Sequence, residues 1–596
     1  MRIVSFFVLT LLTPSLVAAQ DILSVVATSP SMNTISADRE ANVIIDFNGA
    51  VDPATFDAGS AMVFGRWSGV MTGDWFFEND NTRARFVPQR PFSAGEMVTV
   101  SLARHLATPE GNRMSRGYAW QFWTRPRRAM MDLKEMARLT VRRPGEGQVQ
   151  TYGTYAGDLN ADGYSDFVVP NEESNDVRVF MNDGAGGFGP FTIYPIPGGD
   201  RPSTNEGADF NLDGHIDFAV GNGRGDSISV FMGDGTGFLA GPTNYKADEK
   251  VRGLAVLDLN GDGYPDIATA NREFGTISLF LNEGDGTFAT AQTFDPFDVD
   301  PNEGETAASA ADANEDGILD LFVGTFVSEQ ILLFLGDGEG GLTFHTKVDS
   351  VGSAWMITTG DVNGDGHVDV VSANLRNDHT AVVLGDGLGN LSEPVTYPTD
   401  ETPLAIDLGD LDGDGDLDLI TSNLSGGSWT LYENLGDSLG TFGNPREIPA
   451  SSAGSCAVLH DRDNDGTLDM TGIDEIDDLL FLFTNTPLST TAAETPPESS
   501  PLMLLPSYPN PFNDQTTLTF RLDEPAAARL VIYDTLGRIV RTLLDERRTA
   551  GEHALVWDGL DNAGVEVSSG VYFYRLEAAG VERSRMLLRV KSGKTN

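Results

Sequence analysis

The chain has 596 residues, which is too long for a single hydrophobic core, so several domains are expected. Its formal net charge of -49 excludes nucleic acid and anionic membranes as partners, because both bind surfaces rich in lysine and arginine. The acidity is not a sign of disorder, since 40% of the residues are hydrophobic and 9% are aromatic. The composition indicates a folded protein that binds cations.

The N-terminal segment 1–19 predicts a cleaved signal peptide. Arg2 provides a positive start, an apolar run follows, and Val17-Ala18-Ala19 forms a small-residue cleavage site. The apolar run is too short for a span of about 20 residues, and Pro14 interrupts it. Because no second long apolar run follows, we expect an exported chain without a membrane span.

A single cysteine, Cys456, excludes an intramolecular disulfide and lies in an apolar strand pattern, where we expect a buried packing residue. No cysteine follows the signal segment, so lipid anchoring at that end is not expected. An exported multidomain chain without disulfides needs another source of stability, and bound metal is one candidate.

A nine-residue pattern, D-x-[DN]-x-D-G-x-x-D, organises the middle of the chain. Its seven copies begin 49 to 54 residues apart, at Asp158, Asp209, Asp258, Asp312, Asp361, Asp410 and Asp461. An apolar strand precedes each copy, two more follow it, and a short fourth segment closes most units. Four short strands per unit are typical of a propeller blade, and a right-handed solenoid is the competing architecture. The sequence predicts an all-β protein with a seven-bladed β-propeller over 137–485.

The seventh unit has no convincing fourth strand of its own. Its three strands are followed by a stretch rich in Ser, Thr, Pro and Glu. The segment that precedes the first loop resembles the stretches between blades, and it contains a strand pattern near 137–141. We therefore expect this strand to complete the last blade and close the ring.

The seven loops are candidate cation sites. In a calcium loop of the EF-hand kind, side-chain oxygens at positions 1, 3 and 5 and a carbonyl at position 7 converge, and Gly at position 6 permits the turn. Here positions 1, 3, 5 and 9 supply the oxygens: Asp158, Asn160, Asp162, Asp166; Asp209, Asn211, Asp213, Asp217; Asp258, Asn260, Asp262, Asp266; Asp312, Asn314, Asp316, Asp320; Asp361, Asn363, Asp365, Asp369; Asp410, Asp412, Asp414, Asp418; and Asp461, Asp463, Asp465, Asp469.

Hard oxygen ligands without cysteine select Ca²⁺ over Zn²⁺ or Cu²⁺. Carboxylates about 4 Å apart repel one another by several kcal/mol at an effective dielectric near 20, so we expect loops without a cation to splay. The alternative is a set of Asx-turns that need no metal. We expect up to seven structural Ca²⁺ ions, one for each blade.

The loop pattern, together with the recurring F-x-x-GDGxGxF segment, resembles the FG-GAP/VCBS repeats of integrin-α-type β-propellers over about 137–485. The resemblance implies calcium in strand-connecting loops and a role in adhesion or ligand binding. The seventh unit departs from it by lacking GDGxGxF, and Glu315 adds a charge to the fourth loop.

The segment 20–125 alternates strand patterns with Pro and Gly turns, which predicts a β-sandwich. Its segments VIIDFNGAVDPATF, FVPQRPFSAGEMVTVSL and WQFWT resemble bacterial Ig-like domains of the SbsA type. Such domains act as spacers or adhesive stalks. The next segment, 126–136, is expected to be a short, helical connector.

A Ser/Thr/Pro/Glu-rich linker, 486–503, leads to a second predicted β-sandwich at 504–596. The motifs that begin at Tyr508, Trp557 and Ser569 resemble the sorting domain of the type IX secretion pathway. This resemblance implies the type IX machinery as a partner, export across the outer membrane, and an extracellular or surface-attached product. An accessory Ig-like module is the alternative.

We identify no catalytic residue, because the seven histidines are scattered and no nucleophile–base pair stands out. A secreted or surface binding and adhesion protein is favoured, with a glycan or a surface or matrix protein as its partner. The alternative is a carbohydrate-binding or polysaccharide-degrading propeller protein. Trp355 and Trp429 are candidates for stacking on sugars, with blade packing as the alternative, and Arg224-Gly225-Asp226 is interpreted as an ordinary turn.

Overall fold

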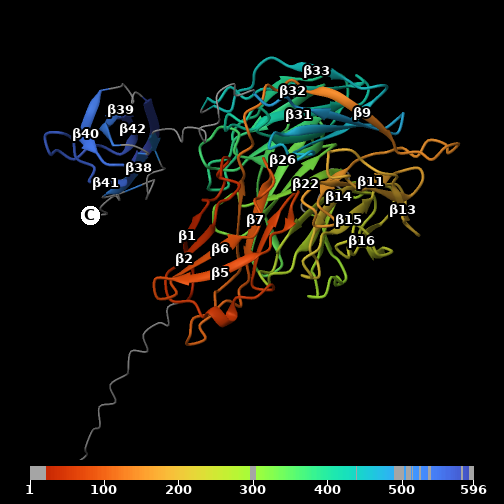
Figure 1. The fold of residues 1–596 in the computed structure, drawn as a ribbon, viewed down its shortest axis with the longest axis horizontal. Helices are drawn as coiled ribbons and strands as arrows, with labels where there is room; N and C mark the ends of the chain where they lie inside the picture. Colours follow the sequence, from red (N-terminus) through yellow and green to blue (C-terminus); the bar gives the residue numbers. More distant parts are fainter. Residues whose placement is uncertain are drawn as a thin grey trace, which may run out of the picture. The chain divides into compact units, whose positions relative to one another are not determined.

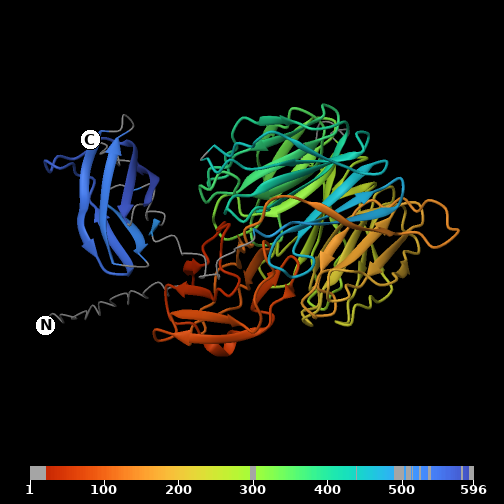
Figure 2. The same cartoon turned by 45° about the horizontal axis from the view of Figure 1, so that its top comes forward.

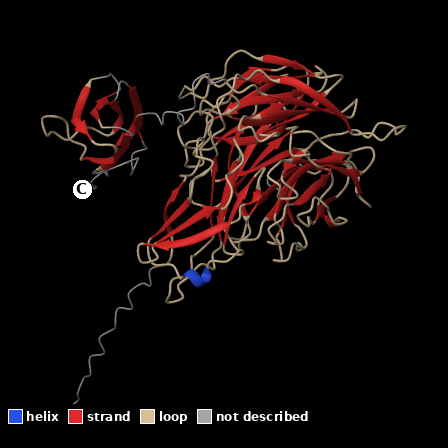
Figure 3. Cartoon of the chain, viewed as in Figure 1, coloured by secondary structure: helices blue, strands red, loops and turns tan. Residues whose placement is uncertain are grey.

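In a computed structural model of the protein, the described residues are 22–295, 304–437, 439–488, 502–504, 512, 515–522, 525–534, 538–578 and 581–589. The chain divides into two compact units, Met1–Leu488 and Ser489–Asn596. Across the described residues the only helical element is the 3-10 helix η1, Pro53–Thr55, so the all-β class is confirmed (Figure 3). No helix in this part of the chain is long and apolar enough to cross a membrane. The predicted signal peptide and most of the predicted linker lie outside the described residues.

The N-terminal part of the first unit is a sandwich of two four-stranded sheets with the orders β1-β2-β6-β5 and β4-β3-β7-β8. The strands are β1 (Val25–Ser29), β2 (Val43–Phe47), β3 (Ala61–Gly65), β4 (Gly69–Val70), β5 (Gly73–Glu78), β6 (Arg83–Pro88), β7 (Met97–Leu102) and β8 (Tyr118–Trp123). Alternation puts one face of each strand inside, as in β2, where Val43, Ile45 and Phe47 are buried. This is the expected β-sandwich, and we refer to it as the Ig-like domain.

Seven four-stranded sheets follow, here numbered sheet 1 to sheet 7 in chain order. Sheets 1 to 4 contain β10 (Tyr155–Gly157), β11 (Asp166–Asn171), β12 (Asp176–Phe180), β13 (Thr192–Pro195); β14 (Pro202–Ala208), β15 (Asp217–Asn222), β16 (Ser227–Phe231), β17 (Thr243–Lys246); β18 (Val251–Leu257), β19 (Asp266–Asn271), β20 (Thr276–Phe280), β21 (Gln292–Phe294); and β22 (Glu305–Ala311), β23 (Asp320–Thr325), β24 (Gln330–Gly336), β25 (Leu342–Asp349). Sheets 5 to 7 contain β26 (Ala354–Gly360), β27 (Asp369–Asn374), β28 (His379–Val383), β29 (Val395–Pro398); β30 (Pro403–Gly409), β31 (Asp418–Asn423), β32 (Ser428–Tyr432), β33 (Arg446–Pro449); and β34 (Gly454–His460), β35 (Asp469–Asp474), β36 (Leu479–Thr484), β9 (Lys134–Thr140).

The first strand of each sheet lies against the first strand of the next. Contacts run from β10 to β14, β18, β22, β26, β30 and β34, and β10 also contacts β34. The second strands are buried along their whole length, as in β31, because neighbouring sheets cover both of their faces. The fourth strands, such as β17, are mostly exposed. The first strands therefore surround a common centre in a propeller-like arrangement.

Sheet 7 takes its outermost strand from a distant part of the chain. β9 pairs antiparallel with β36, with Leu480 opposite Leu139 and Thr484 opposite Lys134. In Figures 1 and 2 this orange strand lies among the blue strands of the last sheet. The strand expected near 137–141 thus pairs as expected, although it begins three residues earlier.

The expectation of a helical connector is wrong. Residues 126–133 contain no helix, and β9 already begins at Lys134. Their backbone amides donate elsewhere: Arg127 to the carbonyl of Gly466, Ala129 to that of Asp412, and Met130 to that of Thr486. Because the sheet array uses these three donors, they are not available for a helical ladder.

The second unit is described in part and forms a separate β-structure. Its strands are β37 (Leu502–Leu504), β38 (Thr516–Leu522), β39 (Ala526–Asp534), β40 (Ile539–Arg548), β41 (Gly551–Trp557), β42 (Gly570–Ala578) and β43 (Val581–Arg589), in sheets ordered β37-β38-β41 and β40-β39-β42-β43. Trp557 and Phe512 lie in its buried core. Most of the motif that begins at Tyr508 falls outside the described residues.

Candidate cation loops and central cavity

Each Asp loop connects the first two strands of its sheet. The aspartate at position 1 follows the first strand directly, and the aspartate at position 9 begins the second, as Asp410 and Asp418 do around β30 and β31. Gly415, at position 6, has a φ of +105°, and its six equivalents lie between +83° and +94°. Only glycine adopts this backbone readily, which confirms the reason for the invariant glycine.

The sixth loop illustrates the geometry that the copies share. Asp410 accepts hydrogen bonds from the amides of Asp414 (3.0 Å) and Gly415 (3.1 Å), and Asp412 accepts one from Asp414 (2.9 Å). Asp418 accepts from the amides of Leu411 (2.8 Å) and Asn434 (2.9 Å), which ties the loop to the third strand. Each carboxylate oxygen keeps lone pairs that these amides do not use.

The carboxylates converge most closely in the two loops that carry four aspartates. Oxygens of Asp410, Asp412 and Asp418 lie within 4.8 Å of one another. The same holds for Asp461, Asp463 and Asp465. Three convergent carboxylates on a Gly-containing turn offer the hard oxygens that Ca²⁺ prefers.

Burial shifts the acidity of these groups. Burial, and then the charges of Asp414 and Asp412, raise the pKa of Asp410 to about 8. Burial likewise raises the pKa of Asp312 and of Asp469 to about 8. The loops therefore hold carboxylates whose ionised form needs a cation close by.

Three loops already have an arginine next to a predicted ligand, and in the fourth loop Arg116 of the Ig-like domain lies 3.4 Å from Asp316. Arg90 of the Ig-like domain pairs with Asp158 in the first loop, with 2.7 Å between Nη1 and Oδ2. In the seventh loop the buried Arg462 lies 3.4 Å from Asp469. Arg462 stands at position 2, where the other six loops have Leu, Phe, Ala or Val. The seven loops are thus not electrostatically equivalent.

The Ig-like domain and the segment after it are seated on the Asp loops, so the domain packs on the sheet array, and its expected role as a spacer or stalk stays a prediction. Six loops make a direct hydrogen bond to them: Asp158 N to Trp67 O (2.8 Å), Arg104 N to Gly261 O (2.7 Å), Ala119 N to Gly317 O (2.7 Å), Asn33 Nδ2 to Gly366 O (3.0 Å), Ala129 N to Asp412 O (2.9 Å) and Arg127 N to Gly466 O (2.6 Å). The second loop lies against Gly69 through Ile216. The domain packs here because the loops present carbonyls that its amides can satisfy.

A cavity of about 270 Å³ occupies the centre of the seven first strands. Strands β3, β7 and β8 of the Ig-like domain line it at the Asp-loop end, with Arg66, Trp67, Gln121 and Trp123 among the lining residues. Seven lining positions, each six residues before the first aspartate of a loop, form a rim ring at the other end of the strands: Tyr152, Ser203, Arg252, Thr306, Trp355, Leu404 and Ser455. Six residues of strand place this ring about 20 Å from the loops.

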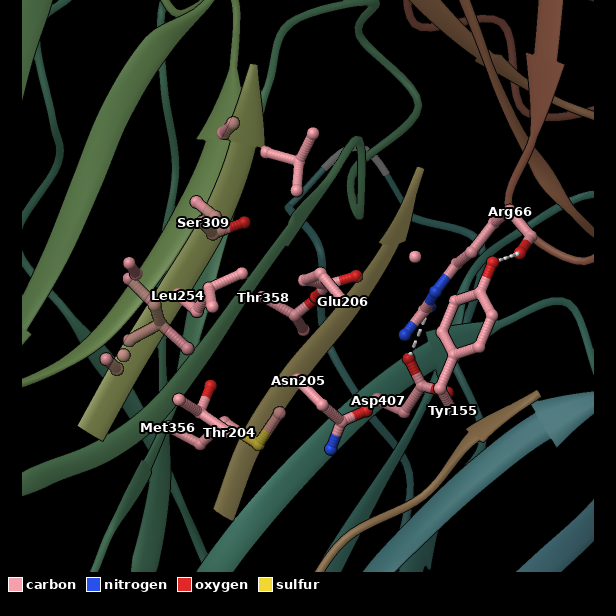
Figure 4. A pocket seen from close by; sticks show the side chains of 18 of the residues that line it. Arg66, Tyr155, Thr204, Asn205, Glu206, Leu254, Ser309, Met356, Thr358 and Asp407 are labelled. Carbon is pink, nitrogen blue, oxygen red and sulfur yellow. Dashed lines mark hydrogen bonds and ion pairs between the residues drawn. The ribbon is translucent and has the colours of Figure 1, made fainter. Parts of the chain in front are cut away.

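Deeper in the cavity, charged groups meet at the Ig-like domain. Arg66 pairs with Asp407 at 3.0 Å, and the Tyr155 hydroxyl donates to the Arg66 carbonyl at 3.0 Å (Figure 4). Glu206 points into the same space (Figure 4). Burial raises its pKa to about 7, against the opposing influence of Arg66. Asp407 also accepts from the amide of Leu459, so the ion pair fixes the domain to sheets 6 and 7.

Apart from Trp355, reasoning on the repeat pattern missed these cavity residues. The loops draw attention because they are alike, whereas the units differ in chemistry at the rim ring. Aligning the seven copies on their aspartates would have displayed this variation within otherwise similar strands. Which repeat positions face the cavity could be learned only from the folded structure.

The remaining sequence predictions have separate outcomes. Cys456 is buried, as expected. Trp429 is fully buried and donates to the Cys456 carbonyl at 2.8 Å, so it packs between sheets. Trp355 is half-buried on the rim ring and stays a candidate for ligand stacking. Arg224-Gly225-Asp226 lies in the turn between β15 and β16.

Comparison with protein families matches three parts of the chain. The FG-GAP-like repeat matches residues 158–220, 209–269, 258–323, 312–372 and 361–421. A bacterial Ig-like domain matches 19–124, and a FlgD Ig-like domain matches 508–581. No curated protein matches the chain.

Two solved structures resemble the chain at low identity. One is an Agrocybe aegerita lectin, described as recognising non-reducing terminal N-acetylglucosamine; it shares 16% identity over 76% of this chain and all of that chain, with a TM-score of 0.39. The other is a protein from Lactobacillus plantarum, with 12% identity over 67% of this chain and 98% of that chain and a TM-score of 0.39.

Proposed function

We propose that this protein is an exported, calcium-stabilised binding protein whose seven sheets close into a seven-bladed β-propeller. The pairing of β9 with β36 and the contact of β10 with β34 support closure, because they join the first and last sheets of the array. The FG-GAP-like repeats support a binding role. The observation that carries the proposal is that the Ig-like domain covers the Asp-loop end and leaves the rim-ring end of the cavity for a ligand.

Calcium is proposed as a structural ion, with up to seven sites at the loop positions given above. The oxygen-only donor set fits this ion, and the burial that raises the pKa values of Asp410 and Asp312 favours positive charge close to these carboxylates. When bound, Ca²⁺ supplies positive charge that offsets the repulsion among the carboxylates. The first, fourth and seventh loops should bind it less tightly, because Arg90, Arg116 and Arg462 already stand beside their ligands.

A glycan is the partner that the rim ring favours over a flat protein surface. Aromatic side chains gather there with polar groups, which is the combination that sugar sites use. Trp355 donates to the Tyr152 hydroxyl at 2.7 Å, and Arg252 stacks near both rings. We further propose that the C-terminal unit directs export through the type IX machinery, with the protein finally extracellular or attached to the surface.

The test is a glycan and matrix-protein binding screen with the full-length secreted protein, performed in 1 mM CaCl₂, in EDTA, and after calcium is restored. We expect binding in calcium, its loss in EDTA and its recovery, together with a bound calcium stoichiometry above one by elemental analysis. An equal thermal melting curve in calcium and EDTA would overturn the structural role of the ion. Absence of binding to every glycan and matrix protein in calcium would overturn the binding function.

A further inference from the structure

We propose that the rim ring and the adjacent Arg272 form a binding site for a carboxylate-bearing sugar of the hexuronate class. This inference rests on the binding function proposed above and names its ligand. The sugar ring would lie against Trp355 and Tyr152, its carboxylate would meet arginine, and its hydroxyls would bond to the cavity wall.

The first argument is a set of buried polar atoms on the rim ring. Within the part of the chain that the structure describes, the hydroxyls of Ser203 and Ser455 and the Nε of Arg252 make no hydrogen bond. The two serines are only 1% and 3% exposed. Burying a donor without a partner is unfavourable, so these three groups favour a polar ligand at the rim ring. All three residues line the cavity.

The second argument is an aromatic surface beside these atoms. Trp355 of sheet 5 and Tyr152, which precedes sheet 1, meet across the ring through their 2.7 Å hydrogen bond. The Arg252 guanidinium lies 5.5 Å from the Tyr152 ring and 5.7 Å from the Trp355 ring. Trp355 remains half-buried, so part of its surface is free for the apolar face of a sugar.

The third argument is an arginine for which the described residues offer no ion pair. The guanidinium of Arg272 lies 4.3 Å from the Phe326 ring and 4.9 Å from the Trp355 ring. Among the described residues Arg272 makes no ion pair, although acidic residues outnumber basic ones by 88 to 39 in this chain. Burial and the nearby charge of Arg252, which itself pairs with Glu172 at 3.0 Å, lower the pKa of Arg272. Aromatic rings cover its flat faces, so the N–H edge is the part left to bind a planar carboxylate.

The wall behind the rim suits the rest of a small polyol. Thr204, Asn205, Ser309 and Thr358 point into the cavity with hydroxyl and amide groups (Figure 4). A volume of about 270 Å³ lies just under the usual range for ligand pockets of about 300–1,000 Å³, which limits the occupant to one sugar unit. That unit can be a free hexuronate or the terminal residue of an acidic glycan.

The experiment is calorimetric titration of the full-length protein in calcium with glucuronate, galacturonate, the methyl ester of glucuronate, glucose, and an oligosaccharide that ends in glucuronate. We expect at least one free hexuronate or the oligosaccharide to bind about tenfold or more tightly than glucose and the ester. Glucose and the ester have no carboxylate, so they cannot form the charged hydrogen-bonded pair with arginine. Binding of the oligosaccharide alone identifies a glycan end as the source, and equal binding of the monosaccharide identifies the free sugar.

Two variants separate a binding role from a structural one. Arg272→Gln should weaken hexuronate binding about tenfold or more, whereas Arg224→Gln, the same change at an exposed arginine in the turn between β15 and β16, should leave it unchanged. Ser203→Ala should weaken binding without lowering the melting temperature, because its hydroxyl has no partner in the free protein.

Wild-type affinity in Arg272→Gln, or equal affinity for glucose and hexuronates, would overturn the inference. Binding of only neutral glycans in the screen described above would also overturn it, while the proposed binding function would stand. Only the absence of binding to every ligand in that screen would contradict both the hexuronate site and the proposed binding function.

Discussion

Asp412→Asn is the substitution whose effect should depend most clearly on calcium. Asp412 is the position 3 residue of the sixth loop, where five sibling loops have asparagine. In the first loop the Asn160 amide donates to Asp162 at 2.9 Å, so the variant can form the equivalent bond to Asp414. In the cation-free protein the change removes a repulsive charge and adds a hydrogen bond.

The size of the effect follows from the acidity of Asp412. Burial, and then the charge of Asp414, raise its pKa from 3.8 to about 6. The folded protein thus holds this proton more tightly than the unfolded chain, so ionisation costs stability progressively as the pH rises from about 4 to about 6. After a discount for its partial exposure, the full cost above pH 6 is about 1–2 kcal/mol.

The assay is differential scanning calorimetry in EDTA and in 1 mM CaCl₂. At pH 8 in EDTA, Asp412→Asn should raise the melting temperature by about 1–3 °C, and near pH 4 the gain should vanish. In calcium the variant should gain less stability from the ion than the wild type does, because one ligand charge is missing. Asp226→Asn, at an exposed aspartate in the turn between β15 and β16, should change neither result. Destabilisation in EDTA at pH 8 would refute the electrostatic reasoning.

Three further substitutions test the packing of the Ig-like domain against the sheets and the electrostatics of the seventh loop. Trp67→Ala should cost about 3–5 kcal/mol in thermal unfolding, because its buried ring joins the Ig-like domain to the sheet core. Phe76→Ala, at an exposed position, should cost little. Similar losses in the two variants would contradict the packing role of Trp67. Burial lowers the pKa of His460 from 6.5 to about 3, so the stability of the protein should fall as the pH drops from about 6.5 to about 3. His460→Gln should make this pH dependence weaker. An unchanged slope in unfolding titrations would exclude His460 as its cause. Arg462→Leu should destabilise the protein in EDTA by about 3–5 kcal/mol, since Asp469 loses its buried partner. Calcium should restore most of this stability. Equal losses in EDTA and in calcium would argue against a cation at the seventh loop.

The loops could be located from the sequence because their chemistry is local. Nine consecutive residues with aspartate at fixed positions and glycine at a left-handed turn specify their own conformation, and the structure has all seven glycines in that region. The four-strand unit was also readable, since each strand is short and apolar and is bounded by turn residues. The pairing of β9 with the last sheet could be inferred from the missing fourth strand of the seventh unit.

The position of the Ig-like domain was not predictable, because it depends on surfaces that meet only after folding. Its amides bond to the loop carbonyls, and Arg90 reaches Asp158 from 68 residues away in the chain. Nothing in either segment alone signals this partnership. The resemblance to SbsA-type domains implied a spacer or stalk, whereas packing made the domain the wall of a cavity.

The sequence by itself determined the repeat, the turn geometry and the acidic oxygen sets, because these depend on neighbours within a few residues. The tertiary structure decided which of the repeated positions face one another. Tyr152, Arg252 and Trp355 stand far apart in the chain and meet only because seven first strands surround one centre. The cavity, its charged wall and its unpartnered hydroxyls arise from this convergence, since non-local contacts are specified by the packing of whole sheets and not by any local pattern.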